Sequence, residues 1–455
     1  MLALRRAGEY KLFGQIAASR LYCASCSAKV TIASVSHNVS TKQQLFFTDP
    51  ISPGSIFFLP NGAKIFNKLV NFMKLQQQHK YGFQEVMTPL IYRKSLWEQS
   101  GHWEKYKEDM FRVEGQDIDK EEYGLKPMNC PGHCVMFKKS ARSYTELPLR
   151  FSDFSPLHRN EASGALSGLT RVRKFHQDDG HIFCTAEQVE SEIKKSLDLV
   201  DLCYSKVFPL GPNGTPTKYS LCLSTRPDNF IGSIEVWNKA ESVLSDILRT
   251  SGKEWRVNEK DGAFYGPKID VLLTDHHGKD HQVATIQLDF NLPERFDLKF
   301  KDKDNVYKRP IMIHRAVFGS LERFMAMIID SNAGKWPFWL NPHQCMVIPL
   351  NTKNHEMVSK SREIANILKG ENVEGTEPVK MNSLHFNVEV DDRAEPVGYR
   401  IKDAIMRNFS YLIMVGAKEI ESEKYAIRTR DSRELSHLSV DEIFQKFVDL
   451  EQNYQ

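Results

Sequence analysis

Hydrophobic residues recur along this chain with two different spacings. Between Pro60 and Gly82 an apolar side chain returns every third or fourth position, as at Ile65, Leu69 and Phe72, and this is the period of an amphipathic helix. The same period predicts helices over residues 187–207 and 321–329. Shorter apolar or alternating segments predict strands at 83–87, 149–158, 171–183, 268–273, 282–290 and 311–316. Together they predict a mixed α/β (α+β) domain over residues 46–340.

The sequence changes character between residues 336 and 342, where Trp, Pro and Asn gather in a segment that we interpret as a linker. Beyond it, strands and helices alternate. We predict strands at 345–349, 386–390, 411–415 and 425–430, and helices at 355–368, 397–406 and 440–450. This alternation indicates a small separate α/β domain over residues 343–455.

The first 45 residues differ from the rest in composition. Their basic side chains, among them Arg5, Arg6 and Lys11, outnumber a single acid, Glu9, and Ser and Ala are frequent. Such a segment is typical of an organelle transit peptide, so we expect residues 1–45 to be a disordered leader. No apolar run approaches the roughly 20 residues that a membrane-spanning helix needs, and we therefore expect no membrane insertion.

Composition narrows the class of protein only a little. A chain of 455 residues is too long for one compact core, and 41% hydrophobic with 26% charged residues is ordinary for a globular protein. The net charge of +3 means that any binding of nucleic acid must use local patches. The eight cysteines show no framework spacing, which favours free thiols in a reducing compartment, and we interpret Cys23 and Cys26 as incidental thiols of the leader.

One predicted strand carries an unusual row of side chains. Because residues two apart in a strand share a face, one side of the segment 171–183 presents Arg171, Arg173, Phe175, Gln177, Asp179 and His181. On the preceding strand, Arg159 and Glu161 share a face as well. A buried face would consist of Val, Ile or Leu. These types suit a nucleotide instead, because arginine neutralises phosphate, a ring stacks on a base and a carboxylate binds an amine.

Three residues far apart in the chain, Cys130, His181 and His314, stand in or beside short motifs. One thiolate and two imidazoles form a three-ligand zinc set, which leaves a fourth position open to a substrate. If the three converge, the metal would be a Lewis acid that binds a small molecule. Taken alone, Cys130 could also be a buried free thiol, and His314 a histidine at the end of a strand.

These motifs resemble those of a known family. Arg159-x-Glu161, a loop and then Arg171-x-x-x-Phe175 resemble motif 2 of the class II aminoacyl-tRNA synthetases, and Gly-Ser-Leu-Glu-Arg-Phe at 319–324 resembles motif 3. The predicted helix and strand that end at Pro89 resemble motif 1. Within this class, the segments at 128–133, 158–161 and 177–181 are similar to those of the threonyl-tRNA synthetases. The resemblance covers residues 46–455 and implies an antiparallel-sheet catalytic domain followed by a small α/β anticodon-binding domain.

The resemblance implies a role for each matching residue. Arg159 would bind the α-phosphate of ATP and Arg323 the γ-phosphate, and both would be catalytic. Phe175 would stack under adenine, while Glu161 would hold the edge of the base. The full implied sets are Arg159, Glu161, Arg171, Arg173, Phe175, Gln287 and Arg323 for ATP, Gln177, Asp179, Tyr265, Lys268, Gln282 and Ser320 for threonine, and Cys130, His181 and His314 for zinc.

Two of the implied pocket residues set a condition on the fold. Gln282 and Gln287 are an odd number of positions apart, so a straight strand could not direct both of them into one pocket. We therefore expect a β-bulge near Ala284.

The implied reaction is the ligation of threonine to tRNA(Thr) in two steps, which are adenylate formation from ATP and transfer to the 3′-terminal ribose. Zn²⁺ would select threonine through its amino group and hydroxyl and reject valine by about 10⁴ or more, and Mg²⁺ would accompany ATP.

Larger family members carry an N-terminal serine-editing domain. We expect no counterpart here, and hence appreciable serine mischarging. The leader implies the mitochondrial matrix, and motif 1 implies a homodimer.

The C-terminal domain carries six basic residues that could contact tRNA. These residues are Arg393, Arg400, Lys402, Arg407, Arg428 and Arg430. We expect about half of them to be ordinary solvated charges.

Two other classes of protein share part of this pattern. A non-catalytic tRNA-binding synthetase paralogue would keep the fold but lose Arg159, Glu161 or Arg323, and all three are present. A zinc hydrolase would need a carboxylate base, such as the one in a helical His-Glu-x-x-His motif, which the sequence lacks.

Overall fold

The computed structural model describes residues 32–114, 121–208, 210, 219–274, 280–370, 378 and 383–455. The span Ile32–Gln455 forms one compact unit. Most of the predicted leader, including Cys23 and Cys26, lies outside the described residues. Its last part is folded, because helix α1 spans Ile32–Gln43 and the side chains of Ser40 and Gln43 are buried. The globular part therefore begins before residue 46, earlier than composition predicts.

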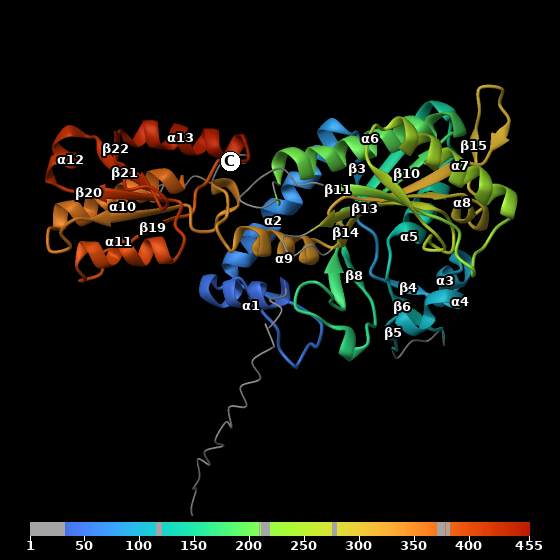
Figure 1. Cartoon of the computed structure of the whole chain (residues 1–455), viewed down its shortest axis with the longest axis horizontal. Helices are drawn as coiled ribbons and strands as arrows, with labels where there is room; N and C mark the ends of the chain where they lie inside the picture. The colour runs from blue at the N-terminus through green and yellow to red at the C-terminus, as the bar shows by residue number, and fades with distance from the viewer. Residues whose placement is uncertain are drawn as a thin grey trace, which may run out of the picture. The chain divides into compact units, whose positions relative to one another are not determined.

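An eight-stranded sheet forms the frame of the first domain (Figure 1). In spatial order its strands are β12 (Trp255–Asn258), β11 (Tyr219–Ser224), β13 (Lys268–Thr274), β14 (Asp280–Asp289), β17 (Ile311–Ala316), β10 (Asp179–Cys184), β7 (Leu149–Asp153) and β3 (Gln84–Glu85). Neighbouring strands run antiparallel except at the two edges, where β12 pairs with β11 and β3 with β7 in parallel. The sheet is therefore mainly antiparallel, as the family resemblance implies.

Helices cover one face of this sheet. Helix α6 (Val189–Asp201) continues into a π-helical turn (Leu202–Val207), and α7 (Ile234–Thr250) lies beside it over the strands (Figure 1). Strand residues such as Ile182 and Ile313 point into the core between these helices and the sheet. Because side chains alternate along a strand, the residues between them point to the opposite face, where a binding site can form.

The opposite face is enclosed at one end by helices α5 (Cys130–Lys138) and α8 (Asn291–Arg295), which pack on a second core that includes Phe183 and Met312. Smaller elements complete the domain. They are β1 (Phe46–Phe47), β2 (Phe57–Phe58), β4 (Ile91–Arg93), α3 (Lys94–Ser100), α4 (His102–Tyr106), β5 (Arg112–Val113), β6 (Tyr123–Leu125), β15 (Phe300–Lys301), β16 (Tyr307–Lys308) and short 3-10 turns at Lys107–Asp109, Tyr144–Glu146, Ser163–Ala165, Ala186–Gln188 and Phe338–Leu340.

The segment that resembles motif 1 is a helix followed by a very short strand. Helix α2 (Pro60–Leu75) begins with proline in its first turn and passes through a π-helical turn (Gln76–Lys80). Gly82 then adopts φ +69°, a conformation that favours glycine. Beyond β3, the backbone N and Oγ1 of Thr88 both donate to Oδ2 of Asp153, at 3.1 and 2.7 Å, which anchors the end of the segment to strand β7.

Each of the two predicted hairpin strands is broken into two. β7 is followed by β8 (Pro156–His158), and β9 (Lys174–His176) precedes β10, so that β8 and β9 form a separate two-stranded sheet. Asp178 lies at the break. Its buried carboxylate accepts the backbone N–H groups of residues 317–319 at 2.8, 3.0 and 3.1 Å. This contact ties the hairpin to the turn between β17 and helix α9 (Leu321–Asn332).

The segment 336–342, which we interpreted as a linker, is packed into the folded protein. Trp336 and Trp339 are buried in the main core. Nε1 of Trp336 donates to Oε1 of Gln43 at 2.8 Å, and Nε2 of Gln43 donates to the carbonyl of Gly334 at 2.8 Å. Large indole side chains bury enough apolar area to hold the segment in the core, despite the neighbouring proline and asparagine residues.

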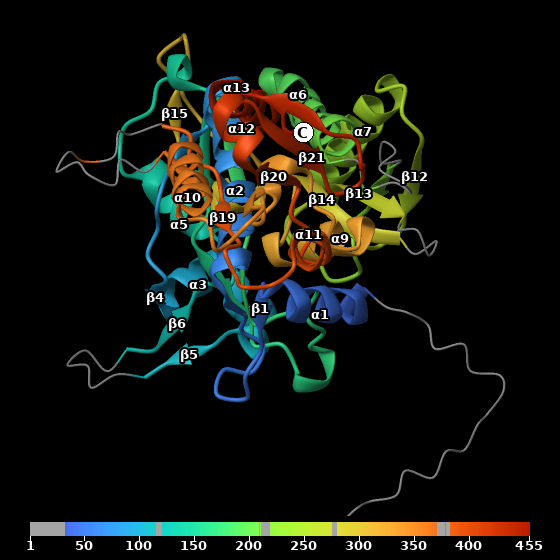
Figure 2. The ribbon, with the colours of Figure 1, turned by 90° about the vertical axis from the view of Figure 1, so that its left-hand side faces the viewer.

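The C-terminal domain has the alternating α/β order that the sequence predicts. Its sheet runs β19 (Val388–Val390), β18 (Cys345–Pro349), β20 (Tyr411–Val415), β21 (Tyr425–Thr429) and β22 (Ser436–Leu438), and its helices are α10 (His355–Lys369), α11 (Val397–Met406), α12 (Ala417–Ser422) and α13 (Val440–Gln452). Along β18, Cys345 and Val347 face the core under α10 and α13, whereas Met346 and Ile348 face α11. Figure 2 shows helices on both sides of this sheet.

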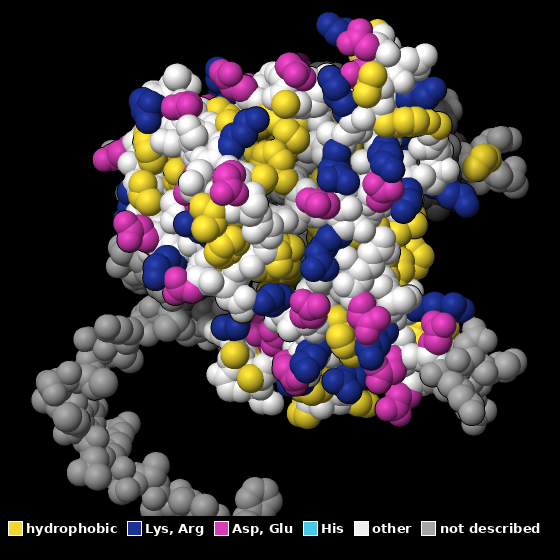
Figure 3. Space-filling model, turned by 90° about the vertical axis from the view of Figure 1, so that its right-hand side faces the viewer, with side chains coloured by type: hydrophobic (Ala, Val, Ile, Leu, Met, Phe, Trp, Pro, Cys, Tyr) yellow, Lys and Arg dark blue, Asp and Glu magenta, His cyan; other side chains and the backbone are white. Residues whose placement is uncertain are grey.

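The surface carries both signs of charge. On the side drawn in Figure 3, lysine and arginine side chains lie among aspartate and glutamate side chains, as the small net charge of +3 implies. Within the described part of the chain, no helix combines the length and the apolar character needed to cross a membrane.

Candidate active site and metal centre

Strand register brings residues from distant parts of the chain into one row. His181 on β10 lies directly opposite His314 on β17, which in turn lies opposite Gln287 on β14. Gln287 lies opposite Lys268 on β13. Residues that are directly opposite in neighbouring strands place their side chains on the same face, within contact distance. The row therefore crosses four strands on the face that α6 and α7 leave uncovered.

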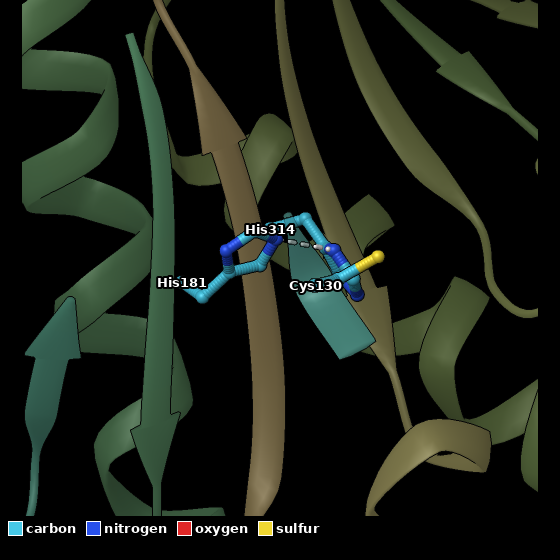
Figure 4. Close-up of side chains that lie close together, drawn as sticks. All are labelled: Cys130, His181 and His314. Atoms are coloured by element: carbon cyan, nitrogen blue, oxygen red, sulfur yellow. Dashed lines mark hydrogen bonds between the residues drawn. The ribbon is translucent and has the colours of Figure 1, made fainter. Parts of the chain in front are cut away.

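Cys130 completes a cluster with the two histidines. It occupies the first turn of helix α5, whose proline at the second position favours a helix start there. The Sγ atom of Cys130 and one ring nitrogen from each of His181 and His314 all lie within 4.8 Å of one another, and all three residues are buried (Figure 4). The predicted convergence of these three residues is confirmed.

Each of the rings of His181 and His314 uses one nitrogen for a contact behind it, which leaves its other nitrogen directed towards the cluster. Nε2 of His314 lies 2.8 Å from Oδ2 of Asp289, and Nδ1 of His181 lies 2.7 Å from Nδ1 of His133. The remaining nitrogens, Nε2 of His181 and Nδ1 of His314, face each other at 3.0 Å. A metal-binding histidine usually donates its other ring N–H to a carboxylate or another acceptor, so this arrangement fits a metal site.

The third potential ligand is a thiol in a dry environment. Burial raises the pKa of Cys130 well above its ordinary value, and the nearby carboxylates of Asp179 and Asp289 act in the same direction. A thiol binds metal only as the thiolate, so a divalent cation at this position would supply the charge that favours deprotonation. The donor set of one sulfur and two nitrogens matches zinc.

The cluster forms the floor of a cavity of about 330 Å³. Most of the residues that the sequence predicts for the site line this cavity. They are Cys130, Arg159, Glu161, Arg171, Phe175, Gln177, Asp179, His181, Tyr265, Gln282, Gln287, His314, Ser320 and Arg323. The structure thus gathers all three predicted zinc ligands, and most residues of the predicted ATP and threonine sets, at a single pocket.

Two predicted residues do not line the cavity. Arg173 donates through Nε to the carbonyl of Glu161 at 2.9 Å and packs its side chain against Gly54, so it supports the hairpin from outside. Nζ of Lys268 lies 2.6 Å from Oδ2 of Asp270. Asp270 is bonded in turn to Gln282, at 2.6 Å, so this pair links Lys268 to the pocket.

The expected bulge is present. Val271 on β13 lies opposite Ala284, but the next residue, Leu272, lies opposite Gln282, so Val283 is the extra residue. The bulge changes the alternation of side chains at this point. As a result both Gln282 and Gln287 line the cavity, although an odd number of positions separates them.

Three guanidinium groups gather at the other end of the cavity. Burial lowers the pKa of Arg323, and the positive charges of Arg159 and Arg171 lower it further. Nε of Arg323 donates to the carbonyl of Thr170 at 3.1 Å, whereas the buried Nε of Arg159 has no hydrogen-bond partner among the described residues. Repulsion among neighbouring cations is relieved by a polyanion, so this end of the pocket suits a phosphate chain.

Two residues expected to bind adenine have other contacts in this structure. The guanidinium of Arg159 lies over the ring of Phe175, 4.9 Å from its centre. The carboxylate of Glu161 forms an ion pair with Arg171, with Nε and Nη2 at 2.9 and 2.8 Å from Oε2. A base could stack on Phe175 and contact Glu161 only if these arginine side chains moved.

The wall beside the metal cluster is polar and closely bonded. Oδ2 of Asp179 accepts from Nδ2 of Asn129 at 3.0 Å, and the hydroxyl of Tyr265 donates to Oε1 of Gln287 at 2.7 Å. Burial raises the pKa of Asp179, so an ammonium group beside it would stabilise the ionised carboxylate. Ser320 caps helix α9 by accepting the backbone N–H of Arg323 at 3.3 Å, which fixes the first turn of the helix that carries that arginine.

Several residues of the site are absent from the sequence prediction. Asp289 lies two positions after Gln287 on β14, so the same-face rule could have found it. Asn129 directly precedes Cys130 in the same motif, so the sequence could have indicated it as well. Arg315 and Thr285 give no comparable signal, because only the pairing of β17 with its neighbours brings them to the cavity.

Arg400, one of the six candidate tRNA contacts, has a structural role. Arg400 is 1% exposed, and its guanidinium donates to the carbonyls of Asp391, Pro349 and Glu395. Arg393 and Arg407 are partly exposed but form ion pairs with acids of their own domain. Arg400 therefore belongs to the core of its domain, and contact of the other candidates with RNA stays a prediction.

We predict that Asp178→Ala lowers the free energy of unfolding of the catalytic domain by about 3–5 kcal/mol, because it leaves the buried Arg315 charge and three backbone N–H groups without their partner. Arg315 is 1% exposed, with Nη1 3.6 Å from Oδ2 of Asp178. The measurement is the urea midpoint of the catalytic-domain transition. Asp246→Ala, which breaks an exposed pair with Arg249, is the control and should cost under about 1 kcal/mol. Equal midpoints for the two variants would contradict the prediction.

The fold and the pocket together define the class of protein. A mainly antiparallel sheet that presents arginines from a hairpin and from a strand–helix turn is the catalytic core of a class II aminoacyl-tRNA synthetase. Residues 111–332 match the family described as the tRNA synthetase class II core domain (G, H, P, S and T), and residues 344–450 match the anticodon binding domain. The matched region contains no editing domain.

The chain belongs to the threonine–tRNA ligases. It is 63% identical over 433 residues to the mitochondrial threonine–tRNA ligase of Saccharomyces cerevisiae, covering 94% of each chain. It is 46% identical over 426 residues to the probable mitochondrial threonine–tRNA ligase of Schizosaccharomyces pombe, covering 90% of this chain and 88% of that one. A crystal structure described as the RNA binding domain of threonyl-tRNA synthetase from Cryptosporidium parvum superimposes with a TM-score of 0.82 at 41% identity, covering 91% and 97% of the two chains.

Proposed function

We infer that this protein ligates threonine to tRNA(Thr) in two steps, first forming threonyl-adenylate from ATP and then transferring the threonyl group to the terminal ribose of the tRNA. The observation that supports this most strongly is the position of Cys130, His181 and His314, a zinc-type donor set, on the floor of the cavity that also holds three arginines. One end of the cavity thus suits a small polar molecule, and the other a phosphate chain.

Threonine would bind at the metal end. Cys130, His181 and His314 would hold Zn²⁺, which when bound supplies a Lewis acid for an amine and a hydroxyl. Asp179 lies beside this position and would accept a hydrogen bond from the amino group of the amino acid, while Gln177, Tyr265, Gln282 and Ser320 would surround the rest. Valine has no hydroxyl, so its binding would leave these buried polar groups unsatisfied.

ATP would bind at the arginine end. Arg159 would contact the α-phosphate, where negative charge develops when the threonine carboxylate attacks, and Arg323 would contact the γ-phosphate. Phe175 would stack under adenine and Glu161 would accept from its amino group, once Arg159 and Arg171 turn towards the phosphates. Mg²⁺ would enter with the nucleotide. No general base is needed, because the attacking carboxylate is already ionised.

The remaining parts of the proposal concern partners and place. The C-terminal domain would bind the anticodon region of tRNA(Thr), and residues 46–340 and 343–455 would be the functional domains. A homodimer would form through the segment that resembles motif 1, a proposal supported by the exposed apolar side chains of Met87 (85%) and Ile91 (48%). The names of the relatives and the basic leader support the mitochondrial matrix as the location.

The test is ATP–pyrophosphate exchange with threonine, serine, valine and proline as substrates. We expect exchange to be fastest with threonine, measurable with serine because it has both an amine and a hydroxyl, and slower with valine by about 10⁴. Proline should support none. Exchange that is fastest with proline, or that no amino acid stimulates, would contradict the proposed function.

A further inference from the structure

His133 lies directly behind one of the three potential metal ligands. Its Nδ1 is 2.7 Å from Nδ1 of His181, and the two ring centres are 4.7 Å apart. Neither ring is exposed to solvent beyond 1%. His133 follows Cys130 by three positions on helix α5, so the same helix carries one ligand and the residue that supports another.

The hydrogen bond between the two rings determines which nitrogen of His181 is free. A bond between two imidazole nitrogens contains one proton, so one ring donates and the other accepts. Nε2 of His181 faces Nδ1 of His314 at 3.0 Å, and a nitrogen that binds metal carries no proton. His181 must therefore be protonated on Nδ1 and donate to His133, which accepts through its own Nδ1.

The proton of His133 is then on Nε2, which points towards Asp153. Nε2 of His133 lies 3.8 Å from Oδ2 of Asp153, and both side chains are completely buried. This distance is longer than a hydrogen bond by less than about 1 Å. Nε2 of His133 has no hydrogen-bond partner among the described residues. The chain of contacts that starts at His181 and passes through His133 therefore ends at the carboxylate of Asp153.

Asp153 is itself held firmly in position. It accepts the N–H and hydroxyl groups of Thr88 at 3.1 and 2.7 Å and both the N–H and the hydroxyl of Ser155, and Nζ of the buried Lys126 lies 3.5 Å away. A carboxylate with several donors and a cation beside it stays ionised and fixed. His314 has a carboxylate of its own, Asp289, in direct contact at 2.8 Å. Each histidine of the cluster therefore has a carboxylate behind it, one direct and one through a second imidazole.

We propose that His133, with Asp153 behind it, is a positioning residue for the metal site: it accepts the hydrogen bond from Nδ1 of His181 and so keeps Nε2 of that ring unprotonated and directed at the ion. This inference rests on the proposed zinc site but not on threonine as the substrate. Residues that support a metal ligand in this way typically change metal affinity 10–100-fold when they are replaced.

The experiment measures the rate at which the purified protein transfers zinc to a colorimetric chelator. His133→Leu removes the acceptor, and we expect release about 10–100 times faster than from the wild type. His133→Asn places an amide oxygen where Nδ1 stood, so it should retain the hydrogen bond and release zinc within about 3-fold of the wild-type rate. His343→Leu makes the same change at a buried histidine of the C-terminal region and should leave the rate unchanged.

Two results would overturn the proposal. One is the same rate of release from His133→Leu and the wild type, and the other is release from His133→Asn as fast as from His133→Leu. If His133→Leu does not fold, His133→Gln serves in its place, because it moves the polar group to the Nε2 position and should also release zinc faster. Zinc missing from the wild type would contradict the metal site itself, which distinguishes that failure from a failure of the positioning role.

Discussion

Replacing Arg159 with alanine is expected to lower threonine-dependent ATP–pyrophosphate exchange by about 10²–10³, the usual effect of removing one group that stabilises developing charge. Arg159 lines the cavity, its buried Nε has no partner among the described residues, and it stands near Arg171 and Arg323. It is therefore the guanidinium most ready to accept a new anionic partner. Exchange is measured at saturating ATP and threonine, so that the loss appears in kcat.

Two further variants make this prediction specific. Arg159→Lys keeps the charge but loses the planar pair of donors, so it should recover only part of the activity. Arg249→Ala removes an exposed arginine of helix α7 that is 69% accessible and pairs with Asp246, and it should leave exchange unchanged. A loss in Arg159→Ala no larger than in Arg249→Ala would exclude a role for Arg159 in the reaction.

Replacing Cys130 with serine is expected to release most of the zinc and to remove the selection of threonine over valine. The Sγ atom is one of three potential ligand atoms within 4.8 Å of one another, and a serine hydroxyl does not ionise to bind zinc at neutral pH. We expect the preference for threonine to fall from about 10⁴ to about 10² or less, because a pocket without the metal distinguishes a hydroxyl from a methyl group only weakly. Metal content is measured by atomic emission, and the preference by exchange with the two amino acids.

Cys134 provides a matched control for this change. It lies one helical turn after Cys130, is equally buried, and contacts the sulfur of Met312 at 3.8 Å. Cys134→Ser should keep both the zinc and the preference for threonine. If Cys130→Ser retained as much zinc as Cys134→Ser, Cys130 would have to be removed from the ligand set.

Helices and strands with strong periodicity could be predicted from the sequence. Helix α2, helix α6 and most elements of the C-terminal domain begin and end within a few residues of their predicted limits. Helix α7 was not predicted, although Trp237, Leu244 and Leu248 have the helical spacing, so its signal was present. The proline and asparagine around Trp336 indicated a linker but not that two indoles of this segment are buried in the core.

The candidate site was predicted in part, and for an identifiable reason. Alternation along one strand places Phe175, Gln177, Asp179 and His181 together, and the cavity contains all four. Alternation also placed Arg173 in that row, but strand β9 begins only at Lys174, and Arg173 turns to Glu161 and Gly54 instead. The alternation rule applies only to residues that lie within one continuous strand.

The sequence by itself determined the chemical types available, a thiol, two imidazoles and several arginines, and the faces on which short segments present them. Only the tertiary structure decided that His181 stands opposite His314, 133 positions further along the chain, with His133 and Asp289 behind them. The physical reason is that strand register is set by the packing of the whole sheet, so no local spacing encodes which residues meet across it.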